Sequence, residues 1–97
     1  MRLRYTQQAI ADMAAIADFF EVNNPFVLPK IRSDIEAKIA LIKVYPEASP
    51  QESDRSLRKA VTRRYRYIIH YRLLYEINEL HIIAIRHFRQ KRKFQDS

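Results

Sequence analysis

Basic side chains that could bind an anion, or take part in acid–base chemistry, recur along residues 65–89 of the chain. The candidates are Arg66, His70, Arg72, His87 and Arg89. Arginine binds phosphate or carboxylate through paired hydrogen bonds, and histidine titrates near neutral pH. His87 beside Arg89 could therefore bind a phosphate or assist the cleavage of a phosphodiester. The simpler alternative for His87 is a histidine at the end of a strand that hydrogen-bonds to the backbone.

The other residue combinations that would predict an enzyme of a familiar type are missing from the sequence. The sequence has no glycine, which excludes a phosphate-binding P-loop, a GxGxxG dinucleotide fingerprint and a nucleophile elbow. It has no cysteine, and His70, His81 and His87 lack metal-ligand spacing, so no metal ion or other cofactor is expected. The acidic residues fall in the expected helices and in residues 47–54, which we expect to lie away from the basic strands.

Alternation of side chains predicts the strand that positions the central candidates. Apolar side chains occupy every second position at Tyr65, Tyr67, Ile69, Tyr71 and Leu73. Because successive side chains of a strand point to opposite faces, Arg66, His70 and Arg72 are expected on the other face. A second β-rich run, Leu80 to Ile85, follows after a short polar break, and the two runs together predict an antiparallel hairpin.

Two helices are predicted upstream of this hairpin. Thr6 is a candidate N-cap, and apolar residues then recur at helical spacing until Asn23, shortly before Pro25. A second apolar stripe predicts a helix from Pro29 to about Val44. Two short segments, Leu3 to Tyr5 and Ser56 to Val61, complete the set as strands.

The resulting order β-α-α-β-β-β predicts an α+β fold in which a helical hairpin packs on one face of a small antiparallel sheet. The other face is expected to remain largely open and to carry the basic side chains. Residues 1–97 are long enough for one domain, with about 94–97 as a frayed tail.

Charge and composition favour an acidic partner for this open face. The formal net charge is +7, and residues 55–72 contain several Lys and Arg but no acidic residue. The alternative is an ordinary solubilising surface charge. The sequence begins without the apolar core of a signal peptide, and no apolar run approaches the roughly 20 residues of a membrane span, so a cytoplasmic protein that does not contact membrane is expected.

The element order and three segments together resemble the RelE/ParE toxin superfamily of bacterial type II toxin–antitoxin modules. The segments are ADMAAIADFFEVNNP, LRKAVTRRYRYIIHY and LHIIAIRHFRQ. The match is closer to the ParE-like branch. Residues on positions of that branch's pattern are Arg58, Arg64, Tyr65, Arg66, Tyr67, Tyr71, His87 and Arg89. The sequence departs from the pattern at Phe88, where a glycine is usual.

The resemblance implies a toxin that is neutralised by a cognate antitoxin in a hetero-oligomer. For a ParE-like member it implies poisoning of DNA gyrase by binding rather than by catalysis, so that replication stalls on trapped DNA breaks and growth is arrested. The residues expected to bind the target or antitoxin are Arg58, Arg64, Arg66, His70, Arg72, His87 and Arg89. Two alternatives stay open: a ribosome-dependent mRNA endoribonuclease of RelE type, using His87, Arg89, Arg66 and Arg72, and a non-toxic member that only binds an antitoxin. The absence of any tyrosine after Tyr75 disfavours the endoribonuclease, because Phe94 in the tail cannot exchange a proton.

Overall fold

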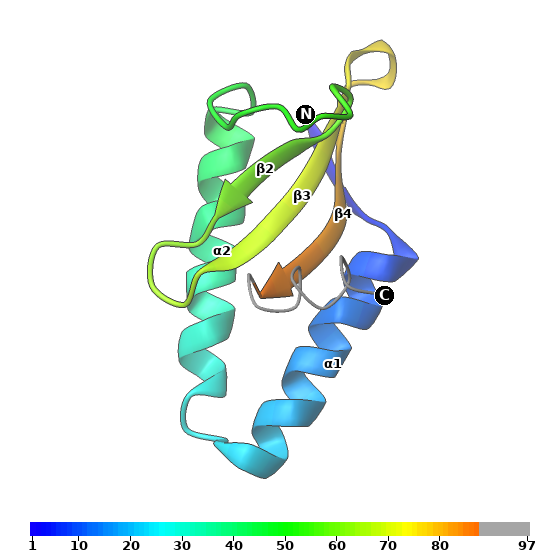
Figure 1. The fold of residues 1–97 in the computed structure, drawn as a ribbon. Helices are drawn as coiled ribbons and strands as arrows, with labels where there is room; N and C mark the ends of the chain where they lie inside the picture. The colour runs from blue at the N-terminus through cyan, green and yellow to red at the C-terminus, as the bar shows by residue number, and fades with distance from the viewer. Residues whose placement is uncertain (88–97) are drawn as a thin grey trace.

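The computed structural model of the chain describes residues 1–87 and contains two helices packed on one face of a four-stranded sheet (Figure 1). The elements are β1 (Arg2–Tyr5), α1 (Gln7–Asn23), α2 (Leu28–Val44), β2 (Arg58–Val61), β3 (Tyr67–Leu74), the short 3-10 helix η1 (Tyr75–Ile77) and β4 (Glu79–His87). The predicted order β-α-α-β-β-β and the helical hairpin on one face of the sheet are confirmed. Neither helix of the described chain has the length and apolar character needed to cross a membrane.

The sheet has the strand order β1-β4-β3-β2 and is mixed, not wholly antiparallel as predicted. β2, β3 and β4 are antiparallel neighbours, whereas β1 runs parallel to β4 from Arg2 opposite Glu79 to Tyr5 opposite Ile82. A parallel pair needs a long crossover connection, and α1, α2 and the strands between β1 and β4 provide it. Sequence patterning identified β1 as a strand but contained no information about its direction.

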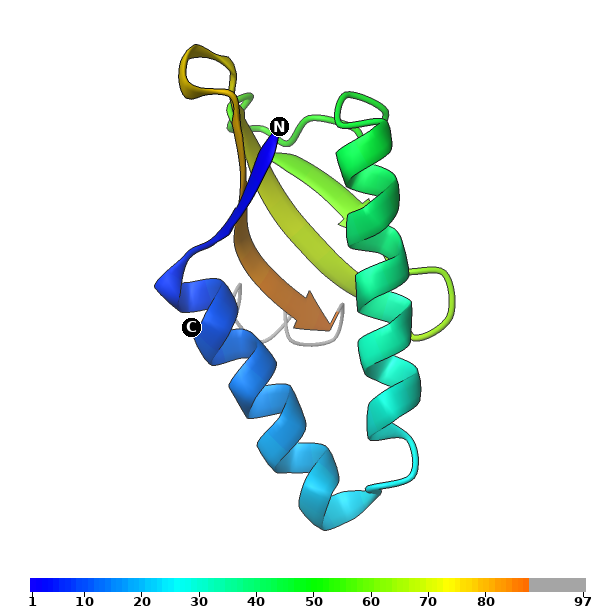
Figure 2. The ribbon, with the colours of Figure 1, turned by 180° about the vertical axis from the view of Figure 1, so that it is seen from behind.

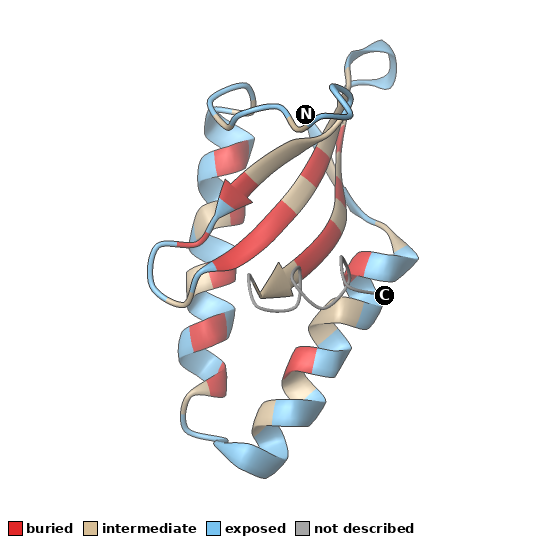
Figure 3. Ribbon diagram, in the orientation of Figure 1, coloured by how far each residue is buried: buried red, intermediate tan, exposed pale blue. Residues whose placement is uncertain are grey.

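The predicted apolar face of β3 is confirmed and forms the centre of the core. Tyr67, Ile69 and Tyr71 are buried, and they pack in one cluster with Ile31 and Ile35 of α2 (Figure 3). Burying one Leu- or Ile-sized side chain contributes roughly 1.5–3 kcal/mol, so this alternation determines which face of the sheet the helices cover. We call the helix-covered side the inner face and the opposite side the outer face.

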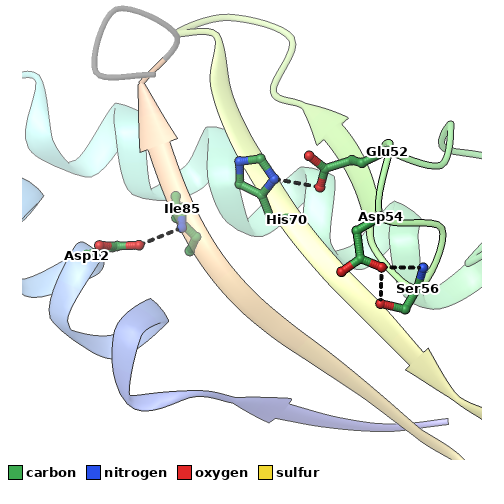
Figure 4. Close-up of polar contacts among 6 residues, drawn as sticks. All are labelled: Asp12, Glu52, Asp54, Ser56, His70 and Ile85. Carbon is green, nitrogen blue, oxygen red and sulfur yellow. Dashed lines mark hydrogen bonds and ion pairs between the residues drawn. The ribbon is translucent and has the colours of Figure 1, made fainter. Parts of the chain in front are cut away.

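A β-bulge in β4 adjusts that strand to α1. The register passes from His70 opposite Ala84 to Tyr71 opposite Ile82, which leaves Ile83 as the extra residue. The Thr6 hydroxyl donates a hydrogen bond to the Ile83 carbonyl (2.8 Å), and Asp12 accepts one from the Ile85 N–H (2.8 Å; Figure 4). These two side chains satisfy backbone groups of β4 beyond the end of β1. Thr6 also accepts a hydrogen bond from the Ala9 N–H, as expected of an N-cap.

α1 and α2 are joined by a turn that lies far from the sheet, and the two helices spread apart from this turn toward the sheet (Figure 2). α1 ends at Asn23 as predicted, and α2 begins one residue before the predicted Pro29. Val22 at the end of α1 and Phe26 in the turn are exposed, with exposed fractions of 84% and 87%. Between the helices lies a mostly apolar groove of about 400 Å³. Its lining residues are Tyr5, Met13, Ala14, Ala17, Arg32, Ile35, Glu36 and Ile39.

Candidate functional site

The outer face of the sheet carries two of the three predicted basic side chains, at His70 and Arg72. The strand registers place Lys59 beside His70, and they place His81 beside Arg72. Arg4 of β1 lies next to His81 on its other side. Arg4, His81 and Arg72 therefore form one row across three strands, so the prediction of a basic outer face holds for β3 and extends to its neighbours.

The acidic residues of the loop between α2 and β2 do not lie away from these basic strands, which corrects our expectation. Glu52 reaches the outer face, where its carboxylate is 2.8 Å from His70 Nδ1 (Figure 4). The loop is positioned by backbone hydrogen bonds from Glu52 N–H to the Leu57 carbonyl and from Lys59 N–H to the Pro50 carbonyl. The pair is mostly shielded from solvent, since the exposed fractions of the two side chains are 15% and 18%. The loop residues between α2 and β2 therefore neutralise part of the outer face.

Asp54 in the same loop stabilises the loop itself. Its carboxylate accepts hydrogen bonds from the Ser56 hydroxyl (2.7 Å) and the Ser56 N–H (3.0 Å; Figure 4). These two hydrogen bonds are the main reason that the pKa of Asp54 is lowered, and the positive charge of Arg72 lowers it further. Asp54 is thus electrostatically coupled to the outer face.

Arg72 retains an unsatisfied donor. Its Nε atom is buried and has no hydrogen-bond partner among the described residues. Buried polar atoms without a partner are few in folded proteins, so Arg72 is an exception among the polar groups of the sheet. The outer face is not fully open, because Ile68 and Ala84 are buried there.

A second carboxylate–histidine pair lies nearer the start of β4. Glu79 contacts His81 Nε2 at 2.9 Å and Arg4 Nε at 3.5 Å. The hydrogen bond with His81 is the largest cause of the lowered pKa of Glu79, and Arg4 lowers it further. Both histidines of the outer face are therefore engaged with carboxylates.

Arg66 lies outside the face on which the sequence placed it. It precedes β3 and occupies the left-handed region with a φ of 63°. Together with Arg63 and Arg64 it belongs to the connection between β2 and β3, residues 62–66, which we call the basic turn. All three arginine side chains are exposed. The prediction that Arg66 lies on the outer face was wrong because the alternation was counted from Tyr65, whereas regular strand geometry begins only at Tyr67.

Thr62 and Asp34 hold the basic turn in place. The buried Thr62 hydroxyl accepts a hydrogen bond from the Tyr67 N–H (2.9 Å) and donates one to Asp34. Asp34, on α2, also accepts from the N–H groups of Arg64 (3.1 Å) and Tyr65 (2.7 Å). A single carboxylate thus fixes two backbone groups of the turn and connects the turn to the helical layer.

These contacts predict an acid-dependent loss of stability at Asp34. Burial raises the pKa of Asp34, but the hydrogen bonds from Tyr65, Thr62 and Arg64 outweigh it, so the net pKa is lowered. A carboxyl group with a lowered folded-state pKa contributes stability above its unfolded pKa, and this contribution is lost as pH falls through the folded value. In urea denaturation from pH 6 to pH 3, the gap in unfolding free energy between the native protein and Asp34→Asn should therefore narrow below about pH 4. A gap that stays constant across this range would contradict the assignment.

His87 and Arg58 lie on the inner side of the sheet. His87 is opposite Tyr67 in the ladder, and the two rings meet edge to face with centroids 5.3 Å apart. Arg58 is opposite Tyr71, and its guanidinium donates to the carbonyls of Glu47 (3.1 Å) and Ser49 (2.8 Å). Arg58 thereby holds the loop that leaves α2, a role that its position in the sequence did not indicate. Arg89, the remaining predicted residue, lies outside the described residues.

The predicted residues consequently do not form one cluster. His70 and Arg72 lie on the outer face, Arg64 and Arg66 in the basic turn, and His87 beside Tyr67. Three further residues, Glu52, Asp34 and Thr62, were not predicted from the sequence. Glu52 pairs with His70, whereas Asp34 and Thr62 hold the basic turn, and the partners in these contacts are 5–31 residues apart in the sequence. No group of three or more metal-ligating side chains occurs within residues 1–87.

Comparison with known proteins identifies the class of molecule that this fold and surface define. A family model described as "ParE toxin of type II toxin-antitoxin system, parDE" matches residues 3–92. The chain belongs to this family of toxins. A solved structure described as "Chromosomal ParDE TA system from P. aeruginosa" shares the fold, with a TM-score of 0.74 and 22% sequence identity over 90% of this chain and 95% of that one. Comparison with curated protein sequences gave no significant match.

Proposed function

We propose that this chain is a toxin that binds and inhibits DNA gyrase in the bacterial cytoplasm, arrests growth, and is neutralised by a cognate antitoxin. The observation that carries the proposal is the ParE toxin family match over residues 3–92. The basic outer face and the basic turn support it physically, because gyrase acts on DNA and a toxin that engages such a complex benefits from groups that bind anions.

The arrangement of the predicted catalytic residues favours a binding protein over an endoribonuclease. Tyr67 is the residue opposite His87, and it lies five positions from Arg72 along β3. At the rise of a strand this separation is about 17 Å. The Arg72 and His87 side chains also lie on opposite faces of the sheet. This separation of Arg72 from His87 supports a role in binding over a shared catalytic role on one phosphodiester group.

The groove between the helices supports a protein antitoxin as the partner. It offers a mostly apolar channel that an apolar segment of a partner could fill. Arg32 and Glu36 line the groove and provide charges of both signs, which could fix the position of a bound segment along the groove. A partner with acidic residues would also complement the formal net charge of +7.

A supercoiling assay tests the proposal. Purified toxin should inhibit the supercoiling of relaxed plasmid by gyrase in a dose-dependent manner, and prior addition of the antitoxin should restore activity. Full gyrase activity at a large excess of folded toxin would contradict the proposed target. Cuts at codon boundaries on programmed ribosomes would instead identify an endoribonuclease, and expression without growth arrest would identify a member that only binds its antitoxin.

A further inference from the structure

The basic turn combines three exposed arginines with a backbone conformation that arginine does not favour. Arg66 has a φ of 63°, a region in which the Cβ atom crowds the following carbonyl group and which Gly or Asn occupies at lower cost. Among residues 1–87 only Asn78 shares a positive φ. An arginine at such a position lowers stability, and strained residues of this kind cluster at sites where the side chain is used.

The surrounding structure keeps this strained turn rigid. The Thr62 N–H donates a backbone hydrogen bond across the turn to the Tyr67 carbonyl (2.8 Å). The Thr62 hydroxyl and the Asp34 carboxylate bind three further N–H groups of the turn and of the first residue of β3. The arginines are therefore presented from a fixed backbone, which reduces the entropy lost when they bind a ligand.

The charges of Arg63 and Arg66 are available for a partner, whereas the charge of Arg64 also attracts the Asp34 carboxylate. None of the ion pairs within the described residues includes Arg63, Arg64 or Arg66. Arg64 lies 5.6 Å from the centroid of the Tyr65 ring, and it also lines an open hollow of about 410 Å³ together with Lys30 and Asp34 of α2. Figure 1 shows the turn as the yellow-green loop beside α2, at the edge of the molecule, where an extended ligand would have access.

The surface around the turn fits a nucleic-acid backbone better than a folded protein. Protein interfaces have an apolar centre, whereas nucleic-acid interfaces are polar and strongly positive. Val61, with an exposed fraction of 41%, is the one large apolar side chain exposed in residues 58–74. Arginine also matches the geometry of phosphate through its paired donors.

We propose that the basic turn is a phosphate-binding site for duplex DNA, in which Arg66 and its neighbours Arg63 and Arg64 contact the backbone without reading sequence. The inference rests on the proposed function in one respect, since the DNA held by gyrase is the duplex that the toxin would meet. In that complex the turn would anchor the toxin on DNA next to the enzyme.

Arg66→Asn tests the site because stability and binding should change in opposite directions. Asparagine tolerates the left-handed region, so the melting temperature should rise by about 4 °C. Each lost phosphate contact should weaken binding to a labelled 20-base-pair duplex about eightfold at 0.1 M salt and reduce the slope of log K against log salt by about 0.9. The loss should be equal on two duplexes of unrelated sequence, because only the backbone is contacted.

Arg2→Gln is the matched control, since it removes the same charge from a position opposite Glu79, at the other end of β4 from His87 and the basic turn. It should leave the melting temperature within about 1 °C and the DNA affinity within about twofold. Unchanged DNA binding by folded Arg66→Asn, or a loss confined to one of the two sequences, would overturn the proposal. So would normal DNA binding together with weakened antitoxin binding, which would assign the turn to an acidic protein segment.

A parallel gyrase assay separates this inference from the proposed function. If the native toxin inhibits gyrase but does not bind DNA, the proposed DNA site is wrong and the proposal of gyrase as the target is unaffected. DNA binding that depends on Arg66, without any inhibition of gyrase, would support the site and contradict the target.

Discussion

Addition of the cognate antitoxin should raise the melting temperature of the toxin by about 10 °C or more. A ligand that binds only the folded state at 100 times its Kd stabilises it by about 2.7 kcal/mol, and each kcal/mol corresponds to about 4–8 °C for a domain of this size. The structural reason is that the isolated chain leaves apolar surface exposed, at the groove between α1 and α2 and at Val22 and Phe26.

The measurement is a thermal unfolding series at increasing concentrations of the neighbouring gene's product. The midpoint should rise with the logarithm of the free antitoxin concentration once the Kd is exceeded. A non-cognate antitoxin of similar size and charge is the control, because it separates specific docking from attraction to a basic protein. Equal melting temperatures with and without the cognate protein would show that this pairing is wrong.

Replacement of Thr62 by valine should destabilise the fold by about 2–3 kcal/mol, although the two side chains have nearly the same shape. The Thr62 hydroxyl is buried, with an exposed fraction of 1%, and it serves Tyr67 N–H as acceptor and Asp34 as donor. Valine would leave a buried N–H group without a partner, and that loss costs more than the average hydrogen bond contributes.

Urea denaturation at pH 7 gives the cost of this substitution, and Ser56→Ala provides the control. Ser56 also donates a hydroxyl hydrogen bond to an aspartate, but on an exposed loop, so its loss should cost about 0.5 kcal/mol or less. The double variant Thr62→Val/Asp34→Asn should cost less than the sum of the two single variants, because both act on one hydrogen-bond network. Additive costs, or a Thr62→Val variant as stable as the native protein, would remove Thr62 from its proposed role in fixing the basic turn.

The fold was largely predictable because its determinants are local patterns. Alternation at Tyr67, Ile69 and Tyr71 identified the inner face, and the apolar stripe of the predicted helix from Pro29 to about Val44 identified α2 to within one residue at its start. Thr6 was recognisable as an N-cap from its place before an apolar helical repeat. The direction of β1 was not predictable, because a four-residue strand has the same pattern in a parallel and an antiparallel pair.

The candidate site was predictable only in part, because its geometry depends on contacts between segments far apart in the chain. Nothing near Glu52 in the sequence indicates that its loop returns to His70, or that Asp34 of α2 binds the turn before β3. Arg66 appeared to continue the alternation of β3, whereas the strand begins one residue later after a left-handed residue. A turn without glycine conceals such a conformation, since a positive φ is usually recognised in a sequence by glycine or asparagine.

The most direct test of the account is whether the toxin traps gyrase on cleaved DNA. Supercoiled plasmid, gyrase, ATP and purified toxin are incubated, the protein is then denatured and digested, and linear plasmid is quantified. We predict linear DNA that accumulates with toxin, requires gyrase, disappears when the antitoxin is added first, and needs a higher toxin concentration with Arg66→Asn than with Arg2→Gln. Plasmid that remains intact at a toxin excess, with supercoiling unaffected, would contradict the account.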